Sequence, residues 1–157
     1  MVNLPGRCVE FTAEDAEEQQ LSEGQPMDIN VISGEIIDSA YKVHSVPGPG
    51  LLESAYSACL THELRKRGLR VRTEVPLPII YDGVTLEVGY RIDQIVEECV
   101  VTELKAVSAV LPVHDAQLLS HLKLSGYKLG LRINFHVVRL RDGIRRMVNE
   151  LNEEPDR

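Results

Sequence analysis

Residues 100–107 read Val100-Val101-Thr102-Glu103-Leu104-Lys105-Ala106-Val107. The β-branched residues that open this segment predict a strand. Glu103 and Lys105 stand two residues apart, so in a strand their side chains share one face of the sheet. Burying an unpaired charge is costly, and each of these side chains therefore needs a partner or a chemical purpose.

A second carboxylate, Asp93, stands in the preceding apolar segment. If residues 97–99 form the connection of a hairpin, Val96 lies opposite Val100. The same register places Asp93 opposite Glu103, on the same face of the sheet. A connection shorter by one residue would shift the register and separate the two carboxylates.

Two converging carboxylates make an oxygen-rich site of the kind that Mg²⁺ or Mn²⁺ prefers. Lys105 beside them would orient or deprotonate a water molecule and stabilise charge on a phosphoryl group. The alternative is an ordinary amphipathic strand, in which the face with Glu103 and Lys105 is solvated or forms a cross-strand ion pair with Arg91. The spacing alone leaves both interpretations open.

The remaining segments alternate between helical and strand periodicity. The predicted elements, in chain order, are a helix from Ile29 to about Val43 capped by Asp28, a helix at 51–67, strands at 71–81 and 85–96 joined by Asp82-Gly83, a strand at 99–107, a helix at 112–125, a strand at 130–140 and a helix at 144–151. This order, ααβββαβα, predicts an α/β (α+β) domain with a mixed sheet of about four strands flanked by helices.

The charge is unevenly distributed along the 157 residues, although the formal net charge is −7. Residues 1–27 sum to −5 and residues 152–157 to −2, so residues 28–151 are neutral. We expect one domain at 28–151 between two acidic tails, the first disordered or loosely attached and acting either as a solubiliser or as an acidic mimic that occupies a basic groove. The acidic whole-chain pI therefore does not argue against a polyanionic substrate.

Composition excludes some classes of protein. No apolar run reaches the ~20 residues of a membrane helix, so we expect no membrane association. The three cysteines include no CxxC pair, which excludes a thiolate zinc site and favours a reducing, cytoplasmic location. Aromatic residues make up only 4%, without tryptophan, so stacking on bases cannot supply most of the affinity for a nucleic acid.

The arrangement of Asp93 and Glu103-Leu104-Lys105 resembles the metal-binding core of the PD-(D/E)xK nuclease superfamily. Residues 50–56, Gly-Leu-Leu-Glu-Ser-Ala-Tyr, resemble the signature of the GxxExxY protein family, a small branch of it. Three further segments resemble that family: residues 112–117, 122–126 and 130–135. The resemblance as a whole covers residues 28–147. It implies a restriction-endonuclease-like core.

The resemblance also implies roles for individual residues. Asp93 and Glu103 would hold a divalent metal ion, Mg²⁺ or Mn²⁺, and Lys105 would be the catalytic lysine. Glu53 matches an accessory carboxylate that contacts the metal directly or through water. An acid in the first turn of a helix is also stabilised by the helix dipole, so Glu53 has a structural explanation as well. Gln117 matches a glutamine that faces the metal site and the substrate.

The helix of Gln117 departs from the pattern of the related exonuclease-like branches at His121, where those branches have a tyrosine. His121 shares a helix face with Gln117 and is interpreted as lining the pocket rather than as a ligand. Tyr56, one turn after Glu53, would order that carboxylate, reach a phosphate or pack in the core. Tyr56, His121 and Arg91 are therefore the expected nucleic-acid contacts.

Two clusters of basic residues offer either phosphate contacts or ordinary solvated surface. They consist of Arg65, Lys66, Arg67, Arg70 and Arg72, and of Arg139, Arg141, Arg145 and Arg146. The function that the sequence predicts is a metal-dependent nuclease that acts on DNA in preference to RNA. The alternative is a non-catalytic domain of the same fold that serves in binding or assembly. A homodimer or a partner protein is expected under either interpretation.

Overall fold

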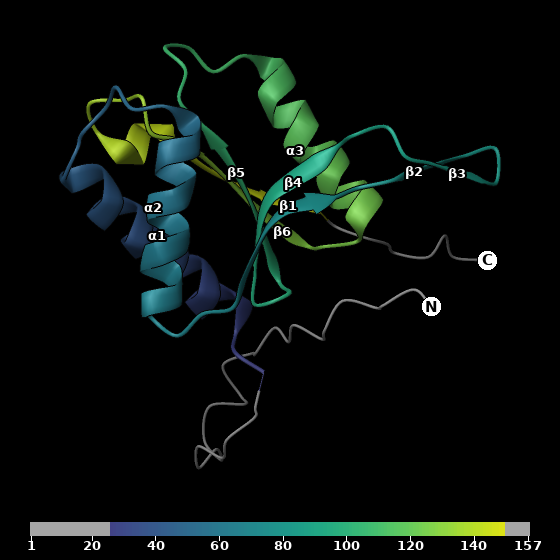
Figure 1. Cartoon of the computed structure of the whole chain (residues 1–157), viewed down its shortest axis with the longest axis horizontal. Coiled ribbons are helices and arrows are strands. Elements are labelled where there is room, and N and C mark those ends of the chain that lie inside the picture. The colour runs from purple at the N-terminus through teal and green to yellow at the C-terminus, as the bar shows by residue number, and fades with distance from the viewer. Residues whose placement is uncertain (1–25, 150–157) are drawn as a thin grey trace.

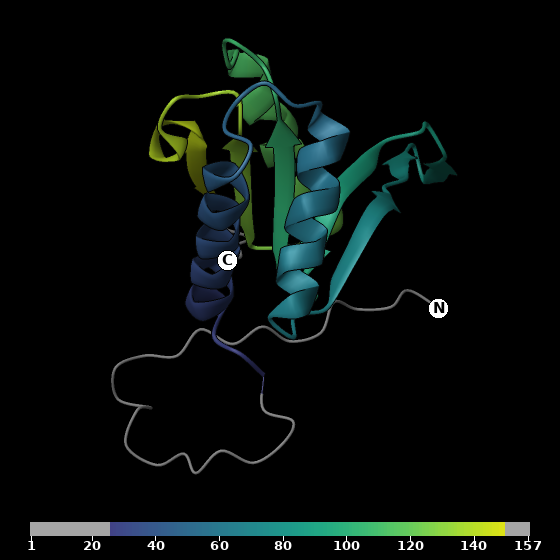
Figure 2. The same ribbon diagram turned by 60° about the vertical axis from the view of Figure 1, so that its left-hand side comes forward.

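The computed structural model describes residues 26–149, which form three layers. Helices α1 (Ile29–Ser45) and α2 (Glu53–Lys66) lie side by side on one face of a five-stranded sheet, and α3 (Pro112–Ser125) covers the other face (Figure 1). The turned view separates α1 and α2 from the strands behind them (Figure 2). The predicted mixed sheet flanked by helices is confirmed.

The main sheet has the strand order β1-β4-β5-β6-β7. The strands are β1 (Val71–Pro76), β4 (Arg91–Val96), β5 (Val100–Lys105), β6 (Leu129–Asn134) and β7 (Ile144–Val148). Strands β5 and β6 are parallel, and the other neighbouring pairs are antiparallel. Because parallel neighbours need a long crossover, α3 lies between β5 and β6 in the chain.

Two apolar clusters hold the layers together. The first lies under α1 and α2 and includes Ile32, Leu60 and Leu104. The second lies under α3 and includes Val101 and Leu118. Val101 and Leu104 belong to opposite faces of β5 because successive side chains of a strand alternate. Burying each such side chain stabilises the fold by about 1.5–3 kcal/mol.

The ends of the first helix follow the sequence prediction. The Asp28 carboxylate accepts a hydrogen bond of 2.9 Å from the Asn30 backbone N–H and so caps α1. The helix ends at Ser45, before the segment of prolines and glycines at 46–50. Proline removes backbone donors there, which prevents the helix from continuing.

The prediction of two long strands at 71–81 and 85–96 is wrong in its boundaries. Each divides, so that a separate pair, β2 (Ile79–Tyr81) and β3 (Val84–Leu86), projects from the main sheet as an arm (Figure 1). Pro76 and Pro78 interrupt the ladder because neither residue has an N–H to donate. The predicted turn at Asp82-Gly83 is confirmed, and both residues have positive φ, 52° and 71°.

The predicted C-terminal helix at 144–151 is also wrong. Ile144–Val148 form strand β7, which pairs with β6. Every residue of β6 is buried, and without β7 one edge of that strand would have no backbone partner. The need to pair this edge overrides a weak local helical pattern. The sheet consequently has five strands rather than about four.

Within the described residues, no helix is long and apolar enough to cross a membrane. The predicted acidic tails fall almost entirely on residues 1–25 and 150–157, outside the described part of the chain. The boundaries predicted for the domain therefore stay predictions at both ends.

Candidate active site

The register that brings two carboxylates together is the one that the sequence predicted. Val96 pairs with Val100 across the connection 97–99, and the β4–β5 pairing continues with Ile95 and Gln94. The recorded pairs end there, and the same register extended by one step sets Asp93 opposite Glu103. Asp93 Oδ2 accepts a 2.8 Å hydrogen bond from the Leu104 backbone N–H. This bond holds the Asp93 side chain between the two strands.

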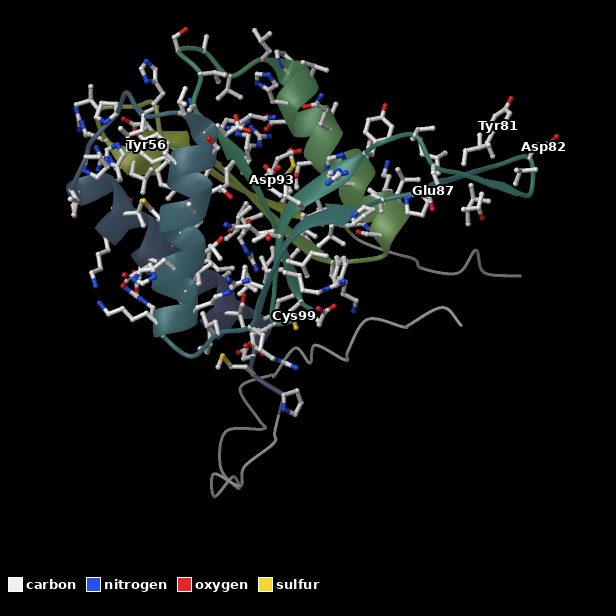
Figure 3. The ribbon with its side chains drawn as sticks, viewed as in Figure 1. Tyr56, Tyr81, Asp82, Glu87, Asp93 and Cys99 are labelled. Atoms are coloured by element: carbon white, nitrogen blue, oxygen red, sulfur yellow. The ribbon has the colours of Figure 1, made fainter. Side chains whose placement is uncertain are left out.

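The two faces of β4 and β5 carry different chemistry. Gln94 points toward α2, where its amide donates to Thr61 at 2.8 Å and accepts from the Thr102 hydroxyl at 3.0 Å. Since side chains alternate along a strand, Asp93 and Glu103 point to the opposite face, under α3. Figure 3 shows Asp93 near the middle of the molecule, far from the tip of the arm.

Glu103 is a buried carboxylate with one unsatisfied oxygen. The residue is only 6% exposed, and among the described residues its Oε2 has no hydrogen-bond partner. Burial raises its pKa to about 7, and the negative charges of Asp93 and Glu53 act in the same direction against the attraction of Lys105. The carboxylate therefore lacks a counter-charge sufficient for its burial.

The pKa values of half-buried Asp93 and of Glu53, which is largely exposed but partly desolvated, shift in the same direction as that of Glu103. Burial raises the pKa of Asp93, and the Leu104 hydrogen bond only opposes this shift. Burial likewise raises the pKa of Glu53, the first residue of α2, and Lys105 again opposes the change. Helix α2 thus brings a third carboxylate into the electrostatic field of the other two.

A fourth carboxylate, Glu74, was not predicted. It lies in β1 between the pairs Thr73–Gln94 and Val75–Ile92, hence opposite Asp93, and its charge raises the pKa of Asp93 and Glu53. Its φ of 51° is uncommon for a residue other than glycine. The register of β1 against β4 could have indicated Glu74. The sequence analysis missed this register because it predicted one strand over 71–81, whereas β1 ends at Pro76.

His121 connects this group to α3. Its Nδ1 lies 3.3 Å from Glu103 Oε1, and its ring meets the Tyr90 ring edge-on with centroids 6.2 Å apart. Burial lowers the pKa of His121, so the neutral imidazole is favoured beside the carboxyl group. Gln117, one turn earlier, is exposed and lines the same pocket as His121. The shared helix face predicted for these two residues is confirmed.

A buried ion pair on the neighbouring strand also escaped the sequence analysis. Arg132 of β6 stands beside Glu103 in the parallel register and forms an ion pair with Asp115 of α3, which also lies 3.5 Å from Arg145. The signal was an arginine within an apolar strand. Its partner is distant in sequence, and only the fold of α3 over the sheet brings the two together.

Tyr56 is a structural residue, which corrects its expected contact with nucleic acid. Its ring is completely buried and stacks on Phe135 at a centroid distance of 4.5 Å. Its hydroxyl donates to the Gly48 carbonyl and accepts a 3.2 Å hydrogen bond from the Leu51 N–H. A side chain with these contacts is not accessible to a bound strand, and instead it fixes the loop before α2.

Arg91 does not neutralise the carboxylates. It is exposed at the first position of β4, opposite Pro76, and within the described residues no ion pair involves it. The alternative of a cross-strand pair with Glu103 is therefore not what the structure shows.

Much of the first basic cluster is neutralised by neighbouring acids, which favours its interpretation as solvated surface. The pairs, with distances of 2.5–3.0 Å, are Arg67–Glu35, Arg70–Glu97 and Arg72–Glu98. Exposed pairs of this kind contribute about 0–1 kcal/mol each to stability. They nevertheless leave these side chains less available for phosphate groups.

The chemistry of the carboxylates fits a divalent cation. Among residues 26–149, no three Asp, Glu, His or Cys side chains come close enough to form a complete metal site by themselves. Mg²⁺, however, commonly uses one or two carboxylates and keeps several water molecules. Asp93 and Glu103 supply such a pair, and the unsatisfied Oε2 of Glu103 is the oxygen that a cation would satisfy.

Residues 30–147, about three quarters of the chain, match the PD-(D/E)XK nuclease superfamily. No curated protein and no solved structure matches the chain. The matched segment includes α3 and the main strands, and the mostly antiparallel sheet between helices is consistent with a restriction-endonuclease-like fold. The family and the fold together show that this chain belongs to the PD-(D/E)XK nuclease superfamily.

Proposed function

We propose that this protein hydrolyses phosphodiester bonds of nucleic acid, DNA in preference to RNA, with Mg²⁺ or Mn²⁺ as cofactor. The observation that supports this function is the convergence of half-buried Asp93 and buried Glu103 beside Lys105, with one oxygen of Glu103 unsatisfied among the described residues. Membership of a nuclease superfamily supports the same substrate class. The proposed place of action is the cytoplasm.

Each residue has a defined part in this proposal. Asp93 and Glu103 would hold the cation, and Glu53 would contact it directly or through water. A bound cation polarises the phosphoryl oxygen and lowers the pKa of a coordinated water molecule. The Lys105 ammonium orients the attacking water and balances the negative charge that develops on the phosphoryl oxygens. Gln117 and His121 position the strand beside the carboxylates.

The proposal extends to the GxxExxY branch of the superfamily. Gly50 precedes α2, and Glu53 is the first residue of that helix, which supports this assignment. Tyr56, the last motif residue, fixes the loop that contains Gly48 and Leu51. In this proposal the motif places Glu53 at the carboxylates and uses the tyrosine to hold it there.

The first experiment is calorimetric titration of Mn²⁺ and Mg²⁺ into the wild type and the Asp93→Ala variant. We expect binding by the wild type and none by the variant. Asp38→Ala, which removes an exposed carboxylate of α1, is the matched control and should bind like the wild type. Absence of binding in all three proteins would favour the non-catalytic binding or assembly module.

The second experiment measures cleavage of labelled DNA and RNA in the presence of Mn²⁺. Asp93→Ala and Lys105→Ala should abolish cleavage while their unfolding transitions remain cooperative. If purified Asp93→Ala cleaves as fast as the wild type, the assignment of the site is wrong.

We also propose that the protein forms a homodimer through the arm of β2 and β3. Its exposed apolar side chains include Ile80 and Tyr81, 72% and 71% exposed, and Figure 3 shows Tyr81 near the tip. Residues 77–90 contain two acids and no lysine or arginine, so a protein surface suits the arm better than a phosphate backbone. Sedimentation velocity should show a dimer that Tyr81→Glu dissociates.

A further inference from the structure

A pocket of about 370 Å³ opens beside the carboxylates, between α3 and the base of the arm. Its size lies within the usual range for small-molecule sites, about 300–1,000 Å³. His121 forms part of its wall and at the same time lies 3.3 Å from Glu103. Whatever occupies the pocket is therefore one side chain away from the proposed catalytic centre.

The lining of this pocket suits a flat, neutral, aromatic group. Ile79, Val113 and Leu124 form apolar walls, and Val113 and Leu124 are 52% and 45% exposed. Exposed apolar side chains around a concave surface are typical of a binding site. Tyr90, 51% exposed, adds an aromatic ring that is already held edge-on by His121.

The polar groups of the pocket can donate and accept hydrogen bonds but carry no fixed charge. Gln117 contributes an amide and Ser120 a hydroxyl, and neither side chain forms a hydrogen bond that the structure records within residues 26–149. Among the described residues, no Asp, Glu, Lys or Arg lines the pocket. A phosphate group would find no counter-charge there, whereas the edge of a nucleobase matches amide and hydroxyl groups.

We infer that this pocket binds the nucleobase adjacent to the scissile phosphate, and that the substrate is a single strand or an unpaired end. The inference rests on the proposed nuclease function. A sugar alone separates a base from its phosphate, so a phosphate at Asp93 and Glu103 places the base in the neighbouring space. In a duplex that base is stacked and paired, and it can enter a pocket only after leaving the stack.

The test compares 2′-deoxyadenosine 5′-monophosphate with 2-deoxyribose 5-phosphate, which has the phosphate but no base. Binding to the full chain in the presence of Mn²⁺ is followed by NMR chemical shifts and calorimetry. We expect the nucleotide to bind at least about five-fold more tightly, because stacking of one base on an aromatic side chain supplies this much or more. Equal affinities for the two phosphates would overturn the inference.

The variant Ala116→Phe fills the pocket from α3 without touching the carboxylates, and it should remove the preference for the nucleotide. Ala58→Phe is the matched control, since it makes the same change at an exposed alanine of α2 in a different surface hollow. It should keep the preference. If Ala116→Phe still prefers the nucleotide over the sugar phosphate, the inference is contradicted. Mn²⁺ affinity is measured in both variants, because loss of Mn²⁺ binding would show a general defect of the protein.

A cleavage assay separates this inference from the proposed function. Single-stranded and fully paired oligonucleotides of the same sequence are compared, and a single strand should be cleaved at least about ten-fold faster. If the protein binds the nucleotide preferentially but cleaves neither oligonucleotide, the proposed nuclease function is wrong. The pocket would then be a binding site for a free nucleotide. If the protein cleaves both oligonucleotides equally fast and binds the nucleotide and the sugar phosphate with equal affinity, the inference about the pocket is wrong and the proposed nuclease function stands.

Discussion

At the scale of single residues, Glu103 links the site to the stability of the protein. Its pKa is raised from 4.5 to about 7 by burial. Between these two pH values the folded state retains a proton that the unfolded state releases. The free energy of unfolding therefore falls as the pH rises through this interval. Above about pH 7, ionisation of Glu103 no longer changes the free energy of unfolding.

The corresponding prediction concerns Glu103→Gln, which keeps the shape of the side chain and removes the charge. Without divalent cations, the variant should gain melting temperature relative to the wild type at about pH 8 and gain little at about pH 5. Thermal denaturation at both pH values measures this difference. Glu87→Gln, on the exposed arm, is the control and should show the same small effect at both. A gain for Glu103→Gln that does not depend on pH would contradict the assignment.

Tyr56 provides a second prediction at this scale. Its hydroxyl is the hydrogen-bond partner of the Gly48 carbonyl and the Leu51 N–H. Tyr56→Phe keeps the stacking on Phe135 but leaves both backbone groups without this partner. The substitution should lower the free energy of unfolding, measured by urea denaturation, by about 1–3 kcal/mol. Tyr41→Phe, at a ring that is 43% exposed, should change stability by less than about 0.5 kcal/mol. Equal effects of the two substitutions would show that the hydroxyl contacts contribute nothing.

At the scale of elements, the distance between α3 and the sheet depends on one glycine. A Cβ at Gly130 in β6 would lie 2.9 Å from Leu118 Cδ1 and 3.0 Å from Leu122 Cδ1. Both leucines are completely buried, so they have little room to move. The absence of a side chain at Gly130 thus permits the close approach that places His121 beside Glu103.

Gly130→Ala should therefore destabilise the protein by about 1–3 kcal/mol through overpacking. Gly34→Ala is its counterpart, because that glycine lies within α1 and a Cβ there meets nothing within 4 Å. It should stabilise the protein by about 0.5–1 kcal/mol through helix propensity. Denaturant unfolding of both variants tests whether their changes in the free energy of unfolding have opposite signs. A neutral Gly130→Ala would mean that α3 can move away from the sheet at no cost.

At the scale of the whole molecule, a bound cation should stabilise the fold, since the unfolded chain does not hold the carboxylates together. Mn²⁺ at about one hundred times its dissociation constant should add about 2.7 kcal/mol, which corresponds to a rise of about 5–10 °C in melting temperature. EDTA should reverse the rise, and Asp93→Ala should not show it. A rise of equal size in that variant would place the cation elsewhere.

The sequence by itself determined the paired carboxylates of this protein. Asp93 and Glu103 are joined by a short connection, and a hairpin register depends on the few residues of that connection. The helix face shared by Gln117 and His121 was equally predictable, because residues four apart in a helix are neighbours. The boundaries of α1 followed from Asp28 and from the prolines after it. Each of these features depends on residues close together in the chain.

Only the tertiary structure decided the features whose partners are distant in sequence. Ile144–Val148 became a strand because β6 has an edge to pair. Tyr56 is buried because Phe135 lies beneath it, and Arg132 is neutralised because α3 brings Asp115 over the sheet. The pocket beside His121 likewise exists only where α3 meets the arm. Such contacts follow from the packing of the whole chain, for which local periodicity contains no information.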